Sequence, residues 1–76
     1  MVVRAVESLS AREAQVLEMV ILGMTNAEVA SHLNVTAHAV KFHLSSIYRK
    51  LGVYNRTEAA VSYLRSRQHE APSEVT

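Results

Sequence analysis

The stretch TAHAVKFHLSSIYRKL, residues 36–51, decides the fold. At 100° per residue, four of its apolar side chains fall within about 60° of one another and form one stripe: Val40, Leu44, Ile47 and Leu51. Thr36 is a typical N-cap residue, and Gly52 is a typical helix stop. We therefore predict a helix over residues 37–51 whose apolar stripe is buried.

Phe42, the chain's single phenylalanine, falls about opposite Leu51 on this helix and should point away from the core, beside Lys41 and Ser45. Such a face suits a helix in the DNA major groove. Lysine can donate to guanine, serine can serve either base type, and an apolar ring can touch the thymine methyl group. The alternative is that Phe42 packs against the N-terminal arm or a partner protein, because single exposed apolar residues are ordinary.

Capping boxes mark three further helix starts, at Ser10-Ala-Arg-Glu13, Thr25-Asn-Ala-Glu28 and Asn55-Arg-Thr-Glu58. The short second helix, a tight turn at 34–35 and the long third helix have the helix-turn-helix arrangement. The sequence therefore predicts an all-α, four-helix bundle-like helix-turn-helix domain, with helices over residues 10–22, 26–33, 37–51 and 56–67.

The composition narrows the function classes. The 76 residues include no cysteine, two glycines and one proline, which excludes disulfides and thiolate metal sites and favours helices. No two of the four histidines have the i, i+4 spacing of a helical metal site, and no Gly-rich phosphate loop or supported Ser/His/Asp set occurs. We expect no metal, no cofactor and no enzyme activity.

Residues 1–67 should form one domain, and residues 68–76, with a proline and few apolar groups, a disordered tail. No apolar run approaches the roughly 20 residues of a membrane span, and the N-terminus lacks a signal-peptide pattern. We therefore expect a cytoplasmic protein without a membrane partner.

The formal charge of +1 conceals a gradient. Residues 1–35 carry two basic and four acidic residues, whereas residues 36–67 carry six basic residues and one acidic residue. A basic half suggests a polyanionic partner on one face. A solvated surface of uneven charge is the alternative that charge alone leaves open.

Four spaced motifs occur in order along residues 9–64: Leu9-Ser10-x-Arg12-Glu13, Gly23-x-Thr25-Asn26-x-Glu28-Val29-Ala30, Val40-Lys41-x-His43 and Ile47-x-x-Lys50-Leu51-Gly52-Val53. Together they resemble the LuxR-type (GerE-like) helix-turn-helix domain, the C-terminal effector of NarL/FixJ response regulators and of quorum-sensing regulators. Several marks in one order are more specific than any one of them. The resemblance implies sequence-specific DNA binding.

The resemblance places the 37–51 helix in the major groove, with Lys41, Phe42 and Ser45 facing bases. It brings six residues near phosphates: Thr25, Asn26, Thr36, His38, Arg49 and Arg56. Helix N-termini favour phosphate, although capping alone would also explain both threonines. Phe42 is bulkier than is usual at its position, and Ser45 stands where several relatives have a longer side chain, so the target sequence cannot be transferred from a relative.

The resemblance also implies dimerisation through the fourth helix, with Ala59, Ala60 and Tyr63 as candidates. Ala60 and Leu64 fit the inward face, whereas Ala59 and Tyr63 lie to one side and could meet a second copy. Such a contact would set two recognition helices about 34–36 Å apart, one DNA turn. A helix that packs only within its own chain is the alternative.

Glu13 lies on the same stripe as Leu17, and a buried acid needs a partner. The capping box supplies one, and the resemblance suggests Lys50, or another basic residue of the 37–51 helix, as another. We predict that Glu13 and Lys50 have structural rather than catalytic roles.

The leading hypothesis is the DNA-binding domain of a dimeric, bacterial-type transcription regulator, with double-stranded DNA as its partner. RNA polymerase and an N-terminal receiver or ligand-binding domain are further partners that the resemblance suggests. The alternative is a protein-interaction module, as in sigma-factor-like contacts with RNA polymerase. Binding to random duplex DNA at low salt separates the two hypotheses.

Overall fold

The computed structural model describes residues 7–70, with side chains described through residue 67. This range contains four helices and no strand: α2 (Ala11–Ile21), α3 (Asn26–Leu33), α4 (Ala37–Leu51) and α5 (Arg56–Glu70). The all-α prediction is confirmed, and the bounds of α3 and α4 are as predicted. Helix α2 is one residue shorter than predicted at each end.

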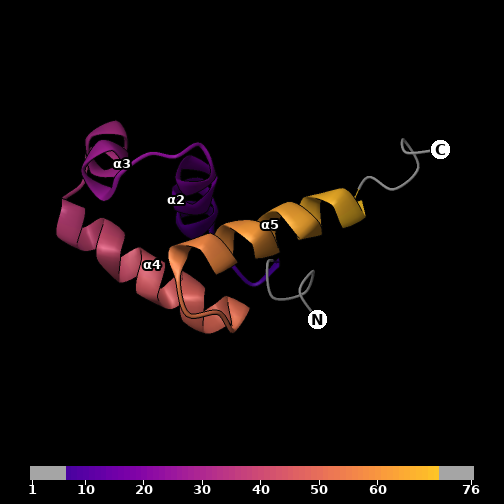
Figure 1. The fold of residues 1–76 in the computed structure, drawn as a ribbon. Coiled ribbons are helices and arrows are strands. Elements are labelled where there is room, and N and C mark those ends of the chain that lie inside the picture. The colour runs from indigo at the N-terminus through magenta and orange to yellow at the C-terminus, as the bar shows by residue number, and fades with distance from the viewer. Residues whose placement is uncertain (1–6, 71–76) are drawn as a thin grey trace.

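Helix α5 continues through Glu70 and is therefore three residues longer than predicted at its C-terminal end. The remainder of the predicted tail, residues 71–76, lies outside the described residues. Helices α2 and α4 each pack against all three other helices, and α5 extends away from α3 (Figure 1).

The core lies where the apolar stripes of the four helices meet. Its α4 part is as predicted, because Val40, Leu44 and Ile47 are buried and Leu51 is half-buried. The other helices contribute the rest of the buried apolar residues: Val16, Leu17, Val20, Val29, Ala30, Ala59 and Tyr63. Each fully buried side chain of valine or leucine size contributes about 1.5–3 kcal/mol.

Three helix starts have the predicted caps. Reciprocal capping boxes join Ser10 to Glu13 and Thr25 to Glu28, and the Thr36 Oγ1 accepts a hydrogen bond from the Ala39 N–H at 3.0 Å. These bonds satisfy N–H groups that have no partner inside the first turn of a helix.

The box at the start of α5 differs from the prediction. Asn55 Oδ1 accepts from the Glu58 N–H at 2.9 Å, as expected. The Glu58 carboxylate, however, accepts from the N–H of Tyr54 and not of Asn55, at 2.8 Å. Glu58, in the first turn of α5, therefore forms a hydrogen bond with the loop residue that precedes the N-cap.

The inward face of α5 also differs from the prediction. Ala59 and Tyr63 are buried, with 0% and 8% of their surface exposed, whereas Leu64 is 42% exposed. Ser62 and Ser66 are buried as well, which completes an i, i+3, i+4, i+7 stripe. The assignment of Ala59 and Tyr63 to an exposed side is wrong, because two small serines occupy core positions that a hydrophobic pattern does not detect.

Candidate nucleic-acid interface

The predicted base-reading residues lie together on the outward side of α4. Lys41, Phe42 and Ser45 are all exposed, and with His38 they line one shallow hollow of about 270 Å³. Phe42 is 69% exposed, so its predicted outward orientation is confirmed. The surface therefore presents an ammonium group, an aromatic ring and a hydroxyl group side by side.

Phe42 is supported by its neighbour His43. The two ring centroids lie 6.0 Å apart with an interplanar angle of 66°, an edge-to-face arrangement that aromatic pairs favour. His43 is itself half-buried at the edge of the core stripe. The exposed ring of Phe42 thus lies against a side chain that the fold holds in place.

Four of the six candidate phosphate contacts are exposed. Thr25 and Thr36 begin α3 and α4 as N-caps, and His38 and Arg49 lie in the first and last turns of α4. Helix N-termini combine unpaired N–H groups with a partial positive charge. The starts of α3 and α4 can therefore attract an anion, whereas Arg49 can do so through its own side-chain charge.

The other two candidates, Asn26 and Arg56, contact each other. Arg56 Nη1 donates to Asn26 Oδ1 at 2.7 Å, and Arg56 Nη2 donates to the carbonyl oxygen of Met24. Both side chains are half-buried. This pair was not predicted from the sequence, because its members lie 30 residues apart.

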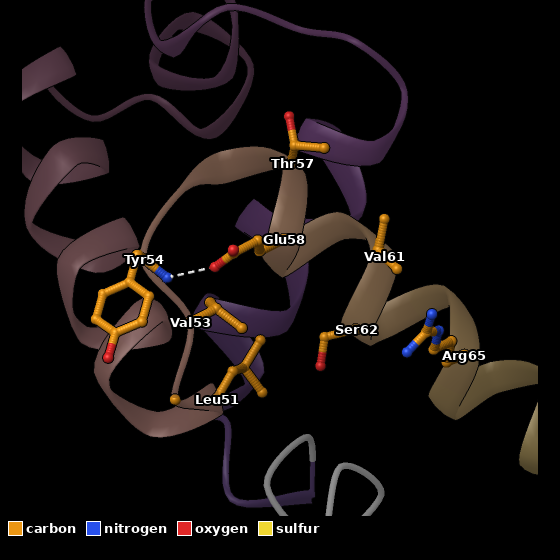
Figure 2. Close-up of a pocket in the computed structure, with 9 residues that line it drawn as sticks. Leu51, Val53, Tyr54, Thr57, Glu58, Val61, Ser62 and Arg65 are labelled. Atoms are coloured by element: carbon orange, nitrogen blue, oxygen red, sulfur yellow. Dashed lines mark hydrogen bonds between the residues drawn. The ribbon is translucent and has the colours of Figure 1, made fainter.

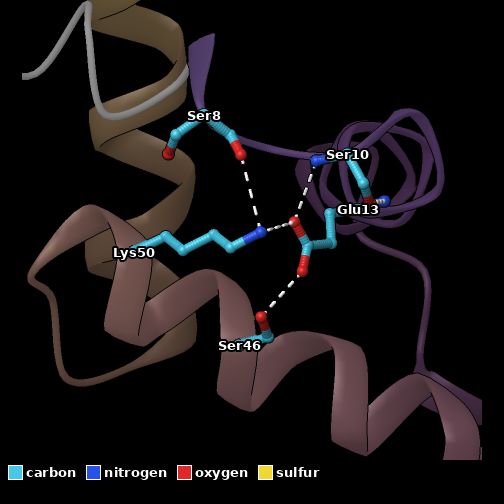
Figure 3. Close-up of polar contacts among 5 residues, drawn as sticks. All are labelled: Ser8, Ser10, Glu13, Ser46 and Lys50. Atoms are coloured by element: carbon cyan, nitrogen blue, oxygen red, sulfur yellow. Dashed lines mark hydrogen bonds and ion pairs between the residues drawn. The ribbon is translucent and has the colours of Figure 1, made fainter.

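A polar network fixes α4 against α2 (Figure 3). Glu13 is only 6% exposed, and its Oε1 accepts from Lys50 Nζ at 2.8 Å and from the Ser10 N–H at 2.9 Å. Its Oε2 accepts from the buried Ser46 hydroxyl at 2.7 Å. The predicted contact with Lys50 is confirmed. Ser46 was not predicted, although its position four residues before Lys50 places both on one side of α4.

The network changes the acidity of Glu13. Burial by itself raises the pKa of this carboxyl group, but hydrogen bonds from Lys50, Ser10 and Ser46 outweigh burial and lower the pKa from 4.5 to about 2. Glu13 is therefore ionised at neutral pH, with both oxygens satisfied. Such a carboxylate suits a structural role.

A second hollow, of about 500 Å³, lies between the α4–α5 connection and α5 (Figure 2). Its walls combine apolar side chains with Arg65, and Tyr54 at its edge is 89% exposed. Val61 lies on the same side of α5 and is 42% exposed. This part of α5, not Ala59 or Tyr63, is the apolar surface that the helix presents to solvent.

Among the described residues, no group of three or more histidine, aspartate or glutamate side chains is placed to hold a metal ion. None of the helices in the described range is both long enough and apolar enough to cross a membrane.

Comparison with known proteins agrees with this geometry. The family model of the bacterial regulatory proteins, luxR family (GerE), matches residues 7–63. The chain is 44% identical over 59 residues to the HTH-type transcriptional regulator YhjB of Escherichia coli (strain K12), which covers 78% of this chain and 30% of YhjB. No solved structure gave a significant match.

Two further relatives are similar over the same region. The transcriptional regulatory protein LiaR of Bacillus subtilis (strain 168) is 44% identical over 55 residues, which covers 72% of this chain and 26% of LiaR. The HTH-type transcriptional activator RamA of Corynebacterium glutamicum is 46% identical over 57 residues, which covers 75% of this chain and 20% of RamA. The chain thus spans 20–30% of the length of these three relatives. It belongs to the luxR family of bacterial regulatory proteins and carries the helix-turn-helix DNA-binding domain of these transcriptional regulators.

Proposed function

We propose that the domain binds DNA with α4 in the major groove and reads base edges with Lys41, Phe42 and Ser45. The observation that carries this proposal is that the three side chains share one exposed surface, with Phe42 69% exposed. A major groove about 12 Å wide accepts a helix and offers guanine acceptors to a lysine and thymine methyl groups to an aromatic ring. Binding would therefore cover an apolar ring that the isolated domain leaves in water.

The proposal assigns the flanking residues to the DNA backbone. Thr25, Thr36, His38 and Arg49 would approach phosphates on either side of the groove, and Asn26 would do so from the start of α3. The exposure of Thr25, Thr36, His38 and Arg49, and the place of Asn26 at the start of α3, support this assignment. Such contacts set register and affinity, whereas base contacts set sequence preference.

We propose that two copies bind together through α5. Val61 and Leu64 are each 42% exposed and lie three residues apart, so both project to one side of the helix. Val61 also lines the second hollow, which extends this apolar surface (Figure 2). An isologous contact here would place two α4 helices about one DNA turn, 34–36 Å, apart.

The chain covers 30% of YhjB and 26% of LiaR, which supports a role within a larger regulator. A cytoplasmic location is part of the same proposal. A receiver or ligand-binding domain, and contact with RNA polymerase, belong to the same proposal. We also propose that the role is purely regulatory, without catalysis.

A titration of the chain with a labelled, mixed-sequence DNA duplex tests the proposal. We expect binding at low salt that weakens as salt rises, with a log–log slope of about −0.9 for each phosphate neutralised. Selection from a random duplex pool should then enrich a shared sequence. A folded chain that fails to bind would favour a protein-interaction module instead, and binding without enrichment would contradict base reading.

A further inference from the structure

We infer that Arg56 acts as a positioning residue, which orients Asn26 toward a DNA phosphate and does not bind phosphate itself. The inference rests on the proposed DNA-binding function. Arg56 is the first residue of α5, and Asn26 is the first residue of α3. The bond between them therefore joins the starts of two helices.

The chemistry of the pair fixes the orientation of the Asn26 amide. A guanidinium group only donates hydrogen bonds, so the Asn26 atom 2.7 Å from Arg56 Nη1 is the carbonyl oxygen. The NH₂ group is then on the other branch of the amide and directed away from Arg56. Its two donors remain for an acceptor near the N-terminus of α3, where partial positive charge favours an anion.

The same guanidinium also fixes the backbone. Arg56 Nη2 donates to the carbonyl oxygen of Met24, in the loop that leads into α3. Met24 directly precedes Thr25, the N-cap. Arg56 thus holds both the side chain of Asn26 and the chain segment that presents it.

Arg56 is poorly placed to bind phosphate as well. Each Nη group already donates one hydrogen bond within the protein, so two of the five N–H donors of the guanidinium are engaged with α3 and the loop before it. Arg56 is also half-buried. In contrast, the NH₂ group of Asn26 donates to no other residue in the part of the chain that the structure describes.

This arrangement links α5 to DNA contact. A displacement of α5, the proposed dimerisation helix, would move the guanidinium and release the amide of Asn26. Dimer formation and phosphate binding at α3 would then influence each other through one side chain.

A double-mutant cycle on DNA affinity tests the inference, with the variants Asn26→Ala, Arg56→Met and the double variant, and a mixed-sequence duplex as the probe. Arg12→Met is the matched control, since it removes the same charge from an exposed position of α2, outside the proposed α5 contact. We expect Asn26→Ala and Arg56→Met each to weaken binding by roughly three- to tenfold, the range for one lost hydrogen bond. The double variant should be no weaker than Asn26→Ala alone.

The salt dependence separates positioning from direct contact. The slope of log affinity against log salt for Arg56→Met should equal that for Arg12→Met. In NMR spectra, the Asn26 side-chain amide signals should shift on DNA addition in the wild type but not in Arg56→Met. Additive losses, or a slope shallower by about 0.9 in Arg56→Met alone, would overturn the inference. Circular dichroism at the titration temperature confirms that each variant is folded. Wild-type binding tests the proposed function separately, so additive losses in a chain that binds would overturn only the role of Arg56.

Discussion

Lys50 Nζ lies 2.8 Å from Glu13 Oε1, which joins α4, the proposed recognition helix, to α2 across 37 residues of sequence. The Ser46 hydroxyl donates to the other oxygen of the same carboxylate (Figure 3). One buried acid therefore holds two consecutive turns of α4. We infer that this network sets the orientation in which α4 presents Phe42.

The substitution Glu13→Gln should lower the free energy of unfolding by roughly 1–3 kcal/mol, because it removes a charged acceptor that satisfies Lys50 and Ser46. Urea denaturation at neutral pH measures the change. Glu7→Gln is the matched control, since Glu7 is exposed, and it should change stability by less than about 0.5 kcal/mol. An unchanged midpoint in Glu13→Gln would remove the structural role of Glu13.

The stability of the wild type should fall in acid through the same group. The pKa of Glu13 is lowered from 4.5 to about 2 on folding, so its contribution is complete above about pH 4.5 and is lost as pH falls toward 2. The shift corresponds to at most about 3 kcal/mol at neutral pH. Denaturation curves between these pH values should show the difference between wild type and Glu13→Gln shrinking as pH falls. Parallel losses in the two proteins would contradict this assignment.

Lys41→Ala should cost roughly 1–3 kcal/mol on a duplex selected by the wild type, and less on a mixed-sequence duplex, because Lys41 is proposed to donate to a base. Fluorescence anisotropy with both duplexes measures the difference. Arg12→Ala, an exposed change on α2, is the control for lost charge and should weaken both complexes slightly and equally. Equal losses on both duplexes for Lys41→Ala would make Lys41 a phosphate contact.

Leu64→Glu should abolish binding of a second copy, because it places a charge in the proposed apolar contact between α5 helices. Sedimentation of the protein with a two-half-site duplex should give one bound copy where the wild type gives two. Folding should be intact, since Leu64 is 42% exposed. A variant that still loads two copies cooperatively would exclude this side of α5 as the interface.

The sequence was sufficient to predict α4 and its two sides. Its stripe from Val40 to Leu51 has regular helical spacing, and Phe42 lies clearly outside it, so periodicity alone assigned both. The caps at Ser10, Thr25 and Thr36 were also predictable, because each bond joins residues three apart. Helical periodicity and N-caps depend only on residues close in the sequence, so they can be predicted without the folded structure.

The inward face of α5 was not predictable in the same way. Ala59, Ser62, Tyr63 and Ser66 form its buried stripe, but a hydrophobic pattern ranks serine as polar and therefore favoured Ala60 and Leu64. The bond between Arg56 and Asn26 was also missed, because tertiary packing and not spacing brings the two residues together. Small polar residues in a core and pairs between distant segments need the folded structure.

The most direct test of the central claim is an NMR measurement of intermolecular contacts between the chain and its selected duplex. The account predicts nuclear Overhauser effects from the Phe42 ring protons to base protons or thymine methyl groups in the major groove. Contacts from Lys41 and Ser45 should go to neighbouring bases. A duplex whose major-groove protons contact a different helix, while the Phe42 ring signals stay unchanged, would contradict the account.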